Sequence, residues 1–249
     1  MIGRLRTRAD AQELMDEPTA GGPARSEAYR HLRRLNRLFG AAGPVVYGVK
    51  RLWRAAGKPR RLSVLDIGAG SGDVNRRLLR WARANGIALT VTLADVSAEA
   101  CEEARRLFRG DPRVRVERRD VFELPEAAAD VVTGTQFLHH FPSPELPRVV
   151  ARMAAASRIG VVVTDIHRHW LAWTAVWLVT RLVSSNRFIR TDGPLSVARG
   201  FTADDWRDLG RKLGVPERYY AWRPLFRYAA VIRKEEIAME QAVEAGHGL

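Results

Sequence analysis

The sequence predicts an α/β protein built on a mostly parallel, seven-stranded sheet. From residue 62 onward, short apolar segments alternate with amphipathic ones. This alternation is typical of parallel strands joined by helices that cover both faces of a sheet. A glycine-rich turn follows the first apolar segment, where a strand would pass into a helix. Two strand-like segments close together near the carboxyl end predict an antiparallel hairpin at the sheet edge.

Apolar spacing and breaker residues place each element along the chain. The amino-terminal part is expected to hold a loose arm over residues 1–25 and helices at 26–40 and 45–56. Strands are expected at residues 62–67, 89–94, 113–117, 130–134, 159–165, 217–222 and 226–233. Helices are expected between them at residues 73–85, 98–108, 145–156, 168–184 and 203–213. Residues 186–202 are polar and predict a long loop, which ends at Thr202 as a helix N-cap.

Composition excludes several classes of protein. At 46% hydrophobic and 28% charged residues, the chain is globular rather than disordered. Cys101 is the one cysteine, which rules out an intrachain disulfide and favours a reducing cytoplasm. The first 18 residues are polar, unlike the apolar core of a signal peptide. The longest apolar stretch, residues 170–183, is too short to span a bilayer. A cytoplasmic location is therefore expected, with peripheral membrane contact left open.

The chain carries a formal net charge of +13. Such an excess can attract nucleic acid or anionic lipid. The cations are nearly all arginine and are spread along the sequence, as a coding bias toward arginine and alanine would produce. We therefore expect the charge to carry no specific role, and nucleic acid is not the expected partner.

The turn after the first strand, residues 66–73, reads Asp-Ile-Gly-Ala-Gly-Ser-Gly-Asp. Glycines at alternate positions let a backbone pass close to a ligand. In the dinucleotide fingerprint G-x-G-x-x-G, a third glycine would stand at position 73, where this chain has Asp73. An acid before the loop, Asp66, would repel a pyrophosphate but can help to hold an ammonium group. These features favour a nucleotide-like cofactor with an amino acid tail.

Two further acids follow the next strands. Asp95 ends the second strand, where a carboxylate can accept both hydroxyls of a ribose. Asp120 follows the third strand, where a carboxylate can accept the exocyclic amine of adenine. Phe122 or Val96 could pack on the ring face. Three acids at successive strand ends are poorly explained by a sharp structural turn alone.

These residues, together with the strand at 129–132 and the sequence Phe137-Leu-His-His-Phe141, resemble class I S-adenosylmethionine-dependent methyltransferases. The resemblance implies a Rossmann-like fold and S-adenosylmethionine as the cofactor, with S-adenosylhomocysteine as the product. It implies a cap or arm over residues 1–60, a catalytic domain over 61–234 with a substrate lid at 170–200, and a tail over 235–249. The cofactor residues that it implies are Asp66, Gly68, Ala69, Gly70, Asp95, Val96, Asp120, Val121, Thr135 and Gln136. No metal site is expected.

Methyl transfer to a phenol needs a base to remove the hydroxyl proton, and histidine suits this role near neutral pH. His139 and His140 follow the fourth strand, and His167 follows the fifth. Adjacent histidines in an extended segment cannot easily face one pocket. His140 is the favoured base because the position just before the loop resembles the base position in some small-molecule methyltransferases, and His167 is second. Each could instead be a structural, hydrogen-bonded histidine.

Trp170, Trp173 and Trp177 share one face of the helix expected at 168–184. This stripe favours a substrate lid, with core packing and membrane docking as alternatives. In the segment that follows, Arg190 could contact a substrate oxygen, as could Arg187 and Arg199, although bracing of the loop is the simpler role. The substrate would then be a small aromatic or lipid-like molecule. The oligomeric state is not predicted.

Residues 13–16, residues 35–37 and the segment 186–202 resemble bacterial methyltransferases found beside type III polyketide synthases. This narrower resemblance implies methylation of a hydroxyl on a polyketide-derived phenol or phenolic lipid. C-methylation of a prenylated quinol, methylation of RNA or protein, and a cofactor-binding scaffold without activity remain as alternatives.

Overall fold

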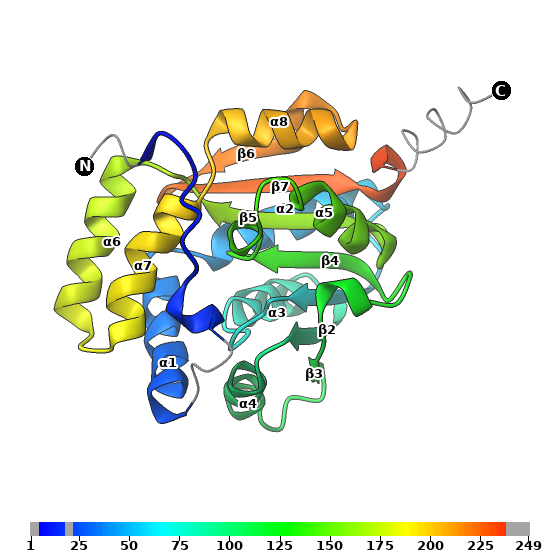
Figure 1. Cartoon of the computed structure of the whole chain (residues 1–249). Helices are drawn as coiled ribbons and strands as arrows, with labels where there is room; N and C mark the ends of the chain where they lie inside the picture. Colours follow the sequence, from blue (N-terminus) through cyan, green and yellow to red (C-terminus); the bar gives the residue numbers. More distant parts are fainter. Residues whose placement is uncertain (1–4, 18–21, 238–249) are drawn as a thin grey trace.

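The fold is a single twisted sheet of seven strands with helices on both faces, seen in a computed structural model that describes residues 5–17 and 22–237 (Figure 1). The strands lie in the order β3-β2-β1-β4-β5-β7-β6. Strands β1 to β5 pair in parallel, and β7 is antiparallel to both of its neighbours. The expected α/β, Rossmann-like class with a terminal hairpin is confirmed. The strands are β1 (Arg61–Ile67), β2 (Ala88–Asp95), β3 (Val114–Arg118), β4 (Ala129–Thr135), β5 (Ser157–Ile166), β6 (Tyr220–Arg223) and β7 (Arg227–Arg233).

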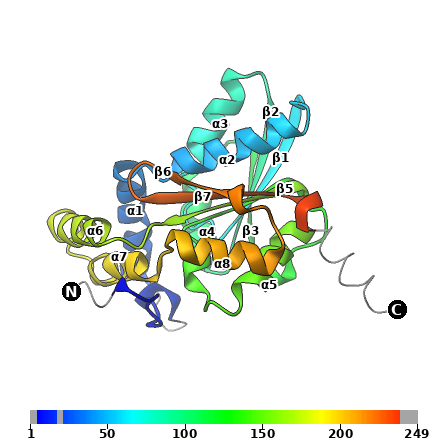
Figure 2. The same ribbon diagram turned by 90° about the horizontal axis from the view of Figure 1, so that it is seen from above.

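Two core clusters divide the helices between the faces of the sheet. The helices in the described chain are α1 (Pro23–Leu38), α2 (Ala42–Ala55), α3 (Asn75–Ala84), α4 (Ala98–Leu107), α5 (Leu146–Ala155), α6 (Trp170–Val183), α7 (Arg187–Arg199) and α8 (Ala203–Leu213). Side chains of α2, α3 and α4 join one cluster, and those of α5 and α8 join the other. The view from above separates α2 and α3 from α5 and α8 across the sheet (Figure 2).

The order of strands reverses between β1 and β4, which lie side by side in the middle of the sheet with Val64 opposite Val131. The crossovers on either side of this pair run in opposite directions. The carboxyl ends of β1, β2, β4 and β5 therefore meet at one edge. In open α/β sheets, this edge is where ligands bind.

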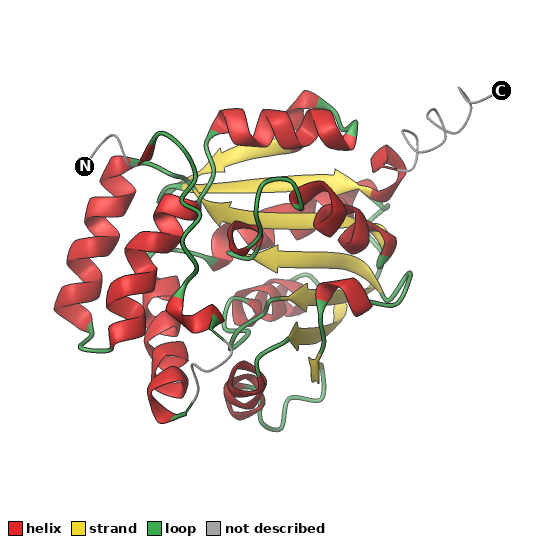
Figure 3. Cartoon of the chain, in the orientation of Figure 1, coloured by secondary structure: helices red, strands yellow, loops and turns green. Residues whose placement is uncertain are grey.

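Helices α1, α6 and α7 gather at that carboxyl edge, on the left of the secondary-structure view (Figure 3). Tyr29 of α1 and Phe188 and Ile189 of α7 bury their side chains together with Met15 of the amino-terminal arm. The arm (residues 5–17) thus lies over the edge of the sheet together with these helices. None of the helices in the described ranges is long and apolar enough to cross a membrane.

The prediction of a loop at residues 186–202 is wrong, because most of this segment forms α7. Asn186 caps the helix by accepting from the backbone N–H of Phe188. Gly193 is a contact position rather than a breaker, since a Cβ there would lie 2.8 Å from Thr180 of α6. Packing against α6 and the arm outweighs the weak helical propensity of a segment with Pro194 inside it. The expected capping box at Thr202 is confirmed, because Thr202 and Asp205 bond reciprocally.

The hairpin begins later than expected. Residues 217–219 form a short 3-10 helix, and β6 begins at Tyr220. The buried ring of Tyr219 packs on Trp206, and its hydroxyl donates to the carbonyl oxygen of that residue, which anchors this turn to α8. Of the expected tail, residues 235–237 continue as helix after β7, and residues 238–249 lie outside the described residues, as do residues 1–4 and 18–21 of the expected arm.

Substitution of Gly48 tests how closely α2 packs on the sheet. A Cβ at Gly48 would lie 2.3 Å from Val162 Cγ1 of β5, whereas a Cβ at Gly43 would meet only Arg77 Nη1 at 3.7 Å. We expect Gly48→Ala to lower the free energy of unfolding by about 1–3 kcal/mol through overpacking. Gly43→Ala, in the same helix, should change it by less than about 1 kcal/mol. Urea denaturation measures both, and equal effects would contradict this account of the packing.

Candidate active site

The glycine-rich loop after β1 depends on its glycines mainly for packing. Gly68 and Gly72 have φ values of 62° and 70°, a region that side chains with a Cβ rarely adopt. A Cβ at Gly68 would lie 2.2 Å from the ring of Phe137, and one at Gly72 would lie 2.4 Å from Leu93. A Cβ at Gly70 would come no closer than 3.8 Å to the ring of Tyr29. A Cβ at Gly70 would thus make only ordinary van der Waals contact with α1, whereas the other two glycines let the loop sit tightly on the sheet.

Asp66 lies beneath this loop rather than in it. Its carboxylate is buried and accepts from Asn75 Nδ2 at 2.6 Å and from Thr133 Oγ1 at 2.7 Å. Burial raises the pKa of Asp66 to about 6, although both hydrogen bonds oppose the shift. Because both oxygens already have donors, Asp66 fixes β1, β4 and the start of α3. Its predicted contact with an ammonium group would have to share these oxygens.

Asp95, at the end of β2, faces the loop. One oxygen accepts from the backbone N–H of Gly70 at 2.8 Å, and the other accepts from that of Ser97 at 2.9 Å. Burial raises the pKa of Asp95, against these two N–H groups and the charge of His140. The predicted ribose acceptor thus lies beside the loop and within electrostatic reach of a predicted base.

The residues predicted to contact adenine follow β2 and β3. Asp120 caps a 3-10 turn by accepting from the N–H of Phe122, and Val121 is buried in the core. Val96 is exposed, and Phe122 packs against Phe141. These side chains and Ala69 lie on the loops after β1, β2 and β3, at the same edge of the sheet.

The end of β4 carries two marks of a ligand site. Gln136 has a φ of 52°, a strained value for a residue with a side chain. The hydroxyls of Thr135 and of its neighbour Thr164 on β5 are buried without a hydrogen-bond partner among the described residues. Unpaired buried hydroxyls are rare and costly. The geometry fits a polar ligand at this point, where the resemblance predicts the reacting end of the cofactor.

Asn36 joins three parts of this site and was not predicted as a site residue. Its amide oxygen accepts from Gln136 Nε2 at 2.9 Å, and its amide nitrogen donates to Asp73 at 3.1 Å. The bonds tie α1 to the end of β4 and to the glycine-rich loop. The sequence signal was the stretch at 35–37, whose role became visible only when the fold brought it to the sheet edge.

His139 and His140 lie next to each other in space, contrary to the expectation for an extended segment. They belong to a single 3-10 turn, Leu138–His140, and their rings are 4.4 Å apart and tilted by 31°. A 3-10 turn rotates successive side chains by about 120° instead of the alternation of a strand. Both rings can therefore reach the amino-terminal arm.

His139 is a buried cation held between two carboxylates. Its Nδ1 lies 2.7 Å from Asp165 Oδ1 of β5, and its Nε2 lies 3.4 Å from Glu13 Oε1 of the arm. Burial alone would lower the pKa of His139, but the charges of Asp165 and Glu13 raise it to about 10. Despite burial, the pKa of Glu13 falls to about 2 because of its bond to His139. An imidazolium that keeps its proton cannot act as a base at neutral pH, so the triad is structural.

His140 is the more accessible ring of the pair. Its Nδ1 lies 2.7 Å from Asp16 Oδ2, and 29% of its side chain is exposed. A carboxylate at Nδ1 fixes the tautomer that leaves Nε2 free to accept a proton. The ring therefore has the arrangement of a carboxylate-oriented general base. Asp16 was not predicted as a site residue, although residues 13–16 contributed to the narrower resemblance.

A divalent cation has candidate ligands at the same place. Glu13, His139 and His140 each offer an atom, all within 4.8 Å of one another. Metal ligation requires a neutral imidazole. The two carboxylates that raise the pKa of His139 therefore oppose a metal here, because they hold the ring in its charged form.

The arm is fastened across the site by side chains that bond to backbone groups. Arg199 of α7 donates to the carbonyl oxygens of His139, His140 and Ala11. From the other side, Asp192 accepts from the N–H groups of Leu14 and Met15 at 2.9 and 3.0 Å. The arm thus carries Glu13 and Asp16 to the two histidines.

The second candidate base, His167, lies at the end of β5 in an aromatic cluster with Tyr228, His169 and Phe226. Burial lowers the pKa of His167 to about 4, so the ring is neutral at physiological pH. Its Nδ1 is buried without a partner among the described residues. No carboxylate orients the ring, which makes it the weaker candidate.

The predicted substrate residues lie on α6 and near the amino end of α7. Trp170 and Trp177 are exposed, and Trp173 stacks on Trp177 with ring centroids 6.5 Å apart. Arg190 braces the turn between α6 and α7 by donating to the carbonyl oxygens of Ser184 and Arg181. The bracing interpretation of this arginine fits the structure, and the contact of these residues with a substrate stays a prediction.

Asp165→Asn tests the buried triad. The charge of His139 stabilises the fold at neutral pH, and this contribution is lost as pH rises from about 6.5 through about 10. We expect Asp165→Asn to lower the free energy of unfolding at pH 7 by about 3–5 kcal/mol and to shift the alkaline loss of stability to lower pH. Asp111→Asn, which breaks a surface pair with Arg113, should cost at most about 1 kcal/mol. Similar losses in urea denaturation of both variants would contradict the triad.

Comparison with known proteins agrees with this geometry. Residues 64–160 match a family model described as a methyltransferase domain. A curated relative, ribosomal RNA small subunit methyltransferase A of Parasynechococcus marenigrum, is 31% identical over 94 residues. That alignment covers 36% of this chain, and the chain spans only 30% of the length of this relative.

Solved structures share the fold. A SAM-dependent methyltransferase from Aquifex aeolicus is similar over 84% of this chain and 97% of its own, with a TM-score of 0.58 and 14% identity. The mitomycin 7-O-methyltransferase is similar over 88% of this chain and 59% of its own, with a TM-score of 0.55 and 19% identity. Residues 64–160 thus match a methyltransferase domain, and the solved structures share the fold of this chain.

Proposed function

We propose that the protein transfers the methyl group of S-adenosylmethionine to a hydroxyl of an apolar aromatic metabolite, a polyketide-derived phenol or phenolic lipid. The observation that carries this proposal is the pair of His140 and Asp16 just after β4, in which Nδ1 of an accessible imidazole lies 2.7 Å from a carboxylate oxygen. A phenol must lose its proton as it attacks the methyl carbon, whereas many stronger nucleophiles need no base. An oriented histidine at this place supports an oxygen acceptor.

The cofactor would supply a methyl group on a positively charged sulfur. Asp95 would hold the ribose, and the loop through Gly70 would leave room for the amino acid tail. Thr135 and Gln136 would lie beneath the reacting end, where buried hydroxyls lack partners. His140 would take the proton at Nε2, while Asp16 stabilises the imidazolium through Nδ1. The remaining catalysis is alignment of the oxygen with the methyl carbon at about 3–3.5 Å.

The arm explains how water would be kept from the reaction. Met15 is buried against Tyr29 and Phe188. The arm therefore covers the sheet edge with an apolar side chain and directs Asp16 at His140. An acceptor that lies beneath it would meet an apolar wall and one base, which suits a flat aromatic ring with a single reacting hydroxyl.

Two other acceptors, a prenylated quinol and RNA, are alternatives to a phenol. C-methylation of a prenylated quinol would use the same base, so the product must be analysed by mass spectrometry and NMR to locate the new methyl group. Methylation of RNA is favoured by the positive charge and by the name of the curated relative. Labelled cofactor with RNA as acceptor tests this second alternative.

Asp95→Ala tests the cofactor assignment. Loss of the carboxylate removes the predicted ribose acceptor and frees the N–H of Gly70. We expect calorimetry to find at least about 100-fold weaker binding of S-adenosylhomocysteine. Asp204→Ala, an exposed aspartate on α8, is the matched control and should bind normally. An unchanged affinity for Asp95→Ala would refute the assignment.

His140→Ala tests the base. With phenolic acceptors and labelled cofactor, we expect turnover to fall by about 10²–10⁴-fold while cofactor affinity stays within about twofold. Asp16→Asn should lower turnover less, because it removes the carboxylate that orients the ring at Nδ1. A wild-type rate for His140→Ala at neutral pH would eliminate this residue as the base.

A further inference from the structure

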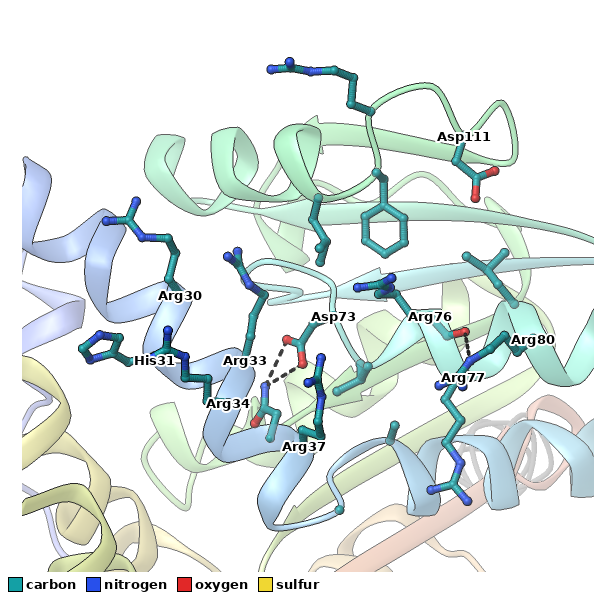
Figure 4. A pocket seen from close by; sticks show the side chains of 18 of the residues that line it. Arg30, His31, Arg33, Arg34, Arg37, Asp73, Arg76, Arg77, Arg80 and Asp111 are labelled. Carbon is teal, nitrogen blue, oxygen red and sulfur yellow. Dashed lines mark hydrogen bonds between the residues drawn. The ribbon is translucent and has the colours of Figure 1, made fainter. Parts of the chain in front are cut away.

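A cleft of about 1460 Å³ lies between α1, α3 and the loop after α4 (Figure 4). Ten arginines line it, against three acidic residues. The arginines are Arg30, Arg33, Arg34, Arg37, Arg76, Arg77, Arg80, Arg83, Arg109 and Arg113. The cleft therefore holds more than half of the net charge of +13. Eight of these arginines come from two short segments, 30–37 and 76–83, which the fold brings to one cleft.

Most of these arginines have no acidic partner. Arg30 and Arg33 pair with Glu103, and Arg113 pairs with Asp111. The other seven make no ion pair with any residue in the described parts of the chain: Arg34, Arg37, Arg76, Arg77, Arg80, Arg83 and Arg109. Like charges at this density repel one another, and an anionic partner would relieve that repulsion. Arginine matches phosphate in particular, since its planar fork can bond two oxygens.

An exposed apolar surface lies along α6. Of the ten large hydrophobic side chains most exposed in the described chain, six are on this helix: Trp170, Leu171, Trp177, Leu178, Leu182 and Val183. Their spacing places five of them, all but Val183, on one helical stripe. The guanidinium of Arg181 lies 4.2 Å from the ring centre of Trp177. Tryptophan beside arginine on an apolar stripe is typical of helices that lie in a membrane interface.

The apolar surface borders the cleft at both ends of α6. At its carboxyl end, Ser184 Oγ lies 2.6 Å from Nδ1 of His31, which lines the cleft. At its amino end, Trp170 stacks on His169, and His169 stacks on Phe226 of the β6–β7 turn.

The β6–β7 turn connects the apolar surface of α6 to the cleft. Its exposed Leu225 packs against Gly40, another residue of the cleft wall. Trp222 of the hairpin and Leu38 of α1 are exposed as well. Nine of the ten most exposed large hydrophobic side chains therefore lie on α6, the hairpin or α1, beside the arginines.

We propose that α6, the tip of the β6–β7 hairpin and the arginine cleft form one surface that binds bilayers containing anionic phospholipid. The apolar side chains would enter the interface, and the arginines would contact phosphate groups. A single-stranded nucleic acid is the poorer occupant, because it needs aromatic rings on which bases stack. The rings in the cleft wall are the half-buried imidazole of His31 and Phe108, which is only 9% exposed.

Helices α1 and α6, which carry part of this surface, gather at the carboxyl edge of the sheet together with α7, and α7 contacts the 3-10 turn of the histidine pair (Figure 1). An apolar acceptor could then pass from the bilayer to His140 without crossing water. This last consequence rests on the proposed function, whereas membrane binding itself does not.

Vesicle binding by the full chain tests the proposal. We expect sedimentation with vesicles of phosphatidylcholine and 30% phosphatidylglycerol, at least about tenfold weaker binding to pure phosphatidylcholine, and loss of binding as salt rises. The triple variant Arg34→Glu, Arg77→Glu, Arg83→Glu should bind anionic vesicles at least about 100-fold less tightly. Arg207→Glu with Arg211→Glu, on the exposed face of α8, is the charge control and should bind nearly as the wild type does.

A second experiment tests the contact between the apolar side chains and the bilayer. Vesicles with brominated acyl chains should quench tryptophan fluorescence, and Trp170→Ser with Leu178→Ser should abolish most of that quenching. Equal binding to neutral and anionic vesicles, equal losses in the triple variant and the control, or displacement of the protein from vesicles by a 20-nucleotide RNA would overturn the proposal.

Turnover of a water-soluble phenol without vesicles distinguishes a failure of membrane binding from a failure of the proposed methyl transfer. We expect the triple variant to keep that turnover, because its residues lie outside the catalytic groups. Loss of vesicle binding with turnover retained would thus be a failure of the surface and not of the proposed reaction.

Discussion

The buried ion triad of Glu13, His139 and Asp165 is the interaction on which the site depends. It joins three elements that are distant in sequence: the arm, the turn after β4 and the end of β5. Removing His139 would leave two carboxylates uncompensated in the interior, which is far more costly than losing a surface pair. The triad therefore fixes the arm to the sheet edge, and the position of the arm determines where Asp16 meets His140.

The same triad separates the roles of two adjacent histidines. His139 is enclosed by two carboxylates and keeps its proton, whereas His140 has one carboxylate partner and an accessible ring. Sequence places the two residues equally well for catalysis. Their difference comes from burial and from partners about 25 and 125 residues away, which only the folded chain brings together. A short sequence motif cannot carry this information.

The sheet, its hairpin and the end-of-strand acids could be predicted because they follow from local patterns. The periodicity of apolar residues predicts strands and helices, and their alternation predicts a parallel sheet. The contacts of α7 could not be predicted in this way. Gly193 and Pro194 favour a loop by propensity, yet Gly193 permits close packing on Thr180 and the buried Phe188 and Ile189 stabilise the helix. Tertiary packing overrides local preference there. Asn36 and Asp192 lie in segments that the sequence singled out, but their roles could not be predicted, since each acts on a segment far away in the chain.

Arginine serves two opposite purposes in this fold, and composition alone does not distinguish them. At the carboxyl edge, Arg8, Arg168 and Arg199 donate to carbonyl oxygens of the arm and of the loops, where several donors on one planar group hold segments together. These arginines are buried or partly buried and have their hydrogen bonds satisfied. In the cleft between α1 and α3, most arginines have no such partners and increase the repulsion between neighbouring helices. A coding bias can account for the number of arginines. It does not explain why seven of them face one cleft beside α6, a helix with exposed tryptophans. Because the unpaired charges cost stability without a ligand, their placement is best explained by a phosphate-rich surface that binds there.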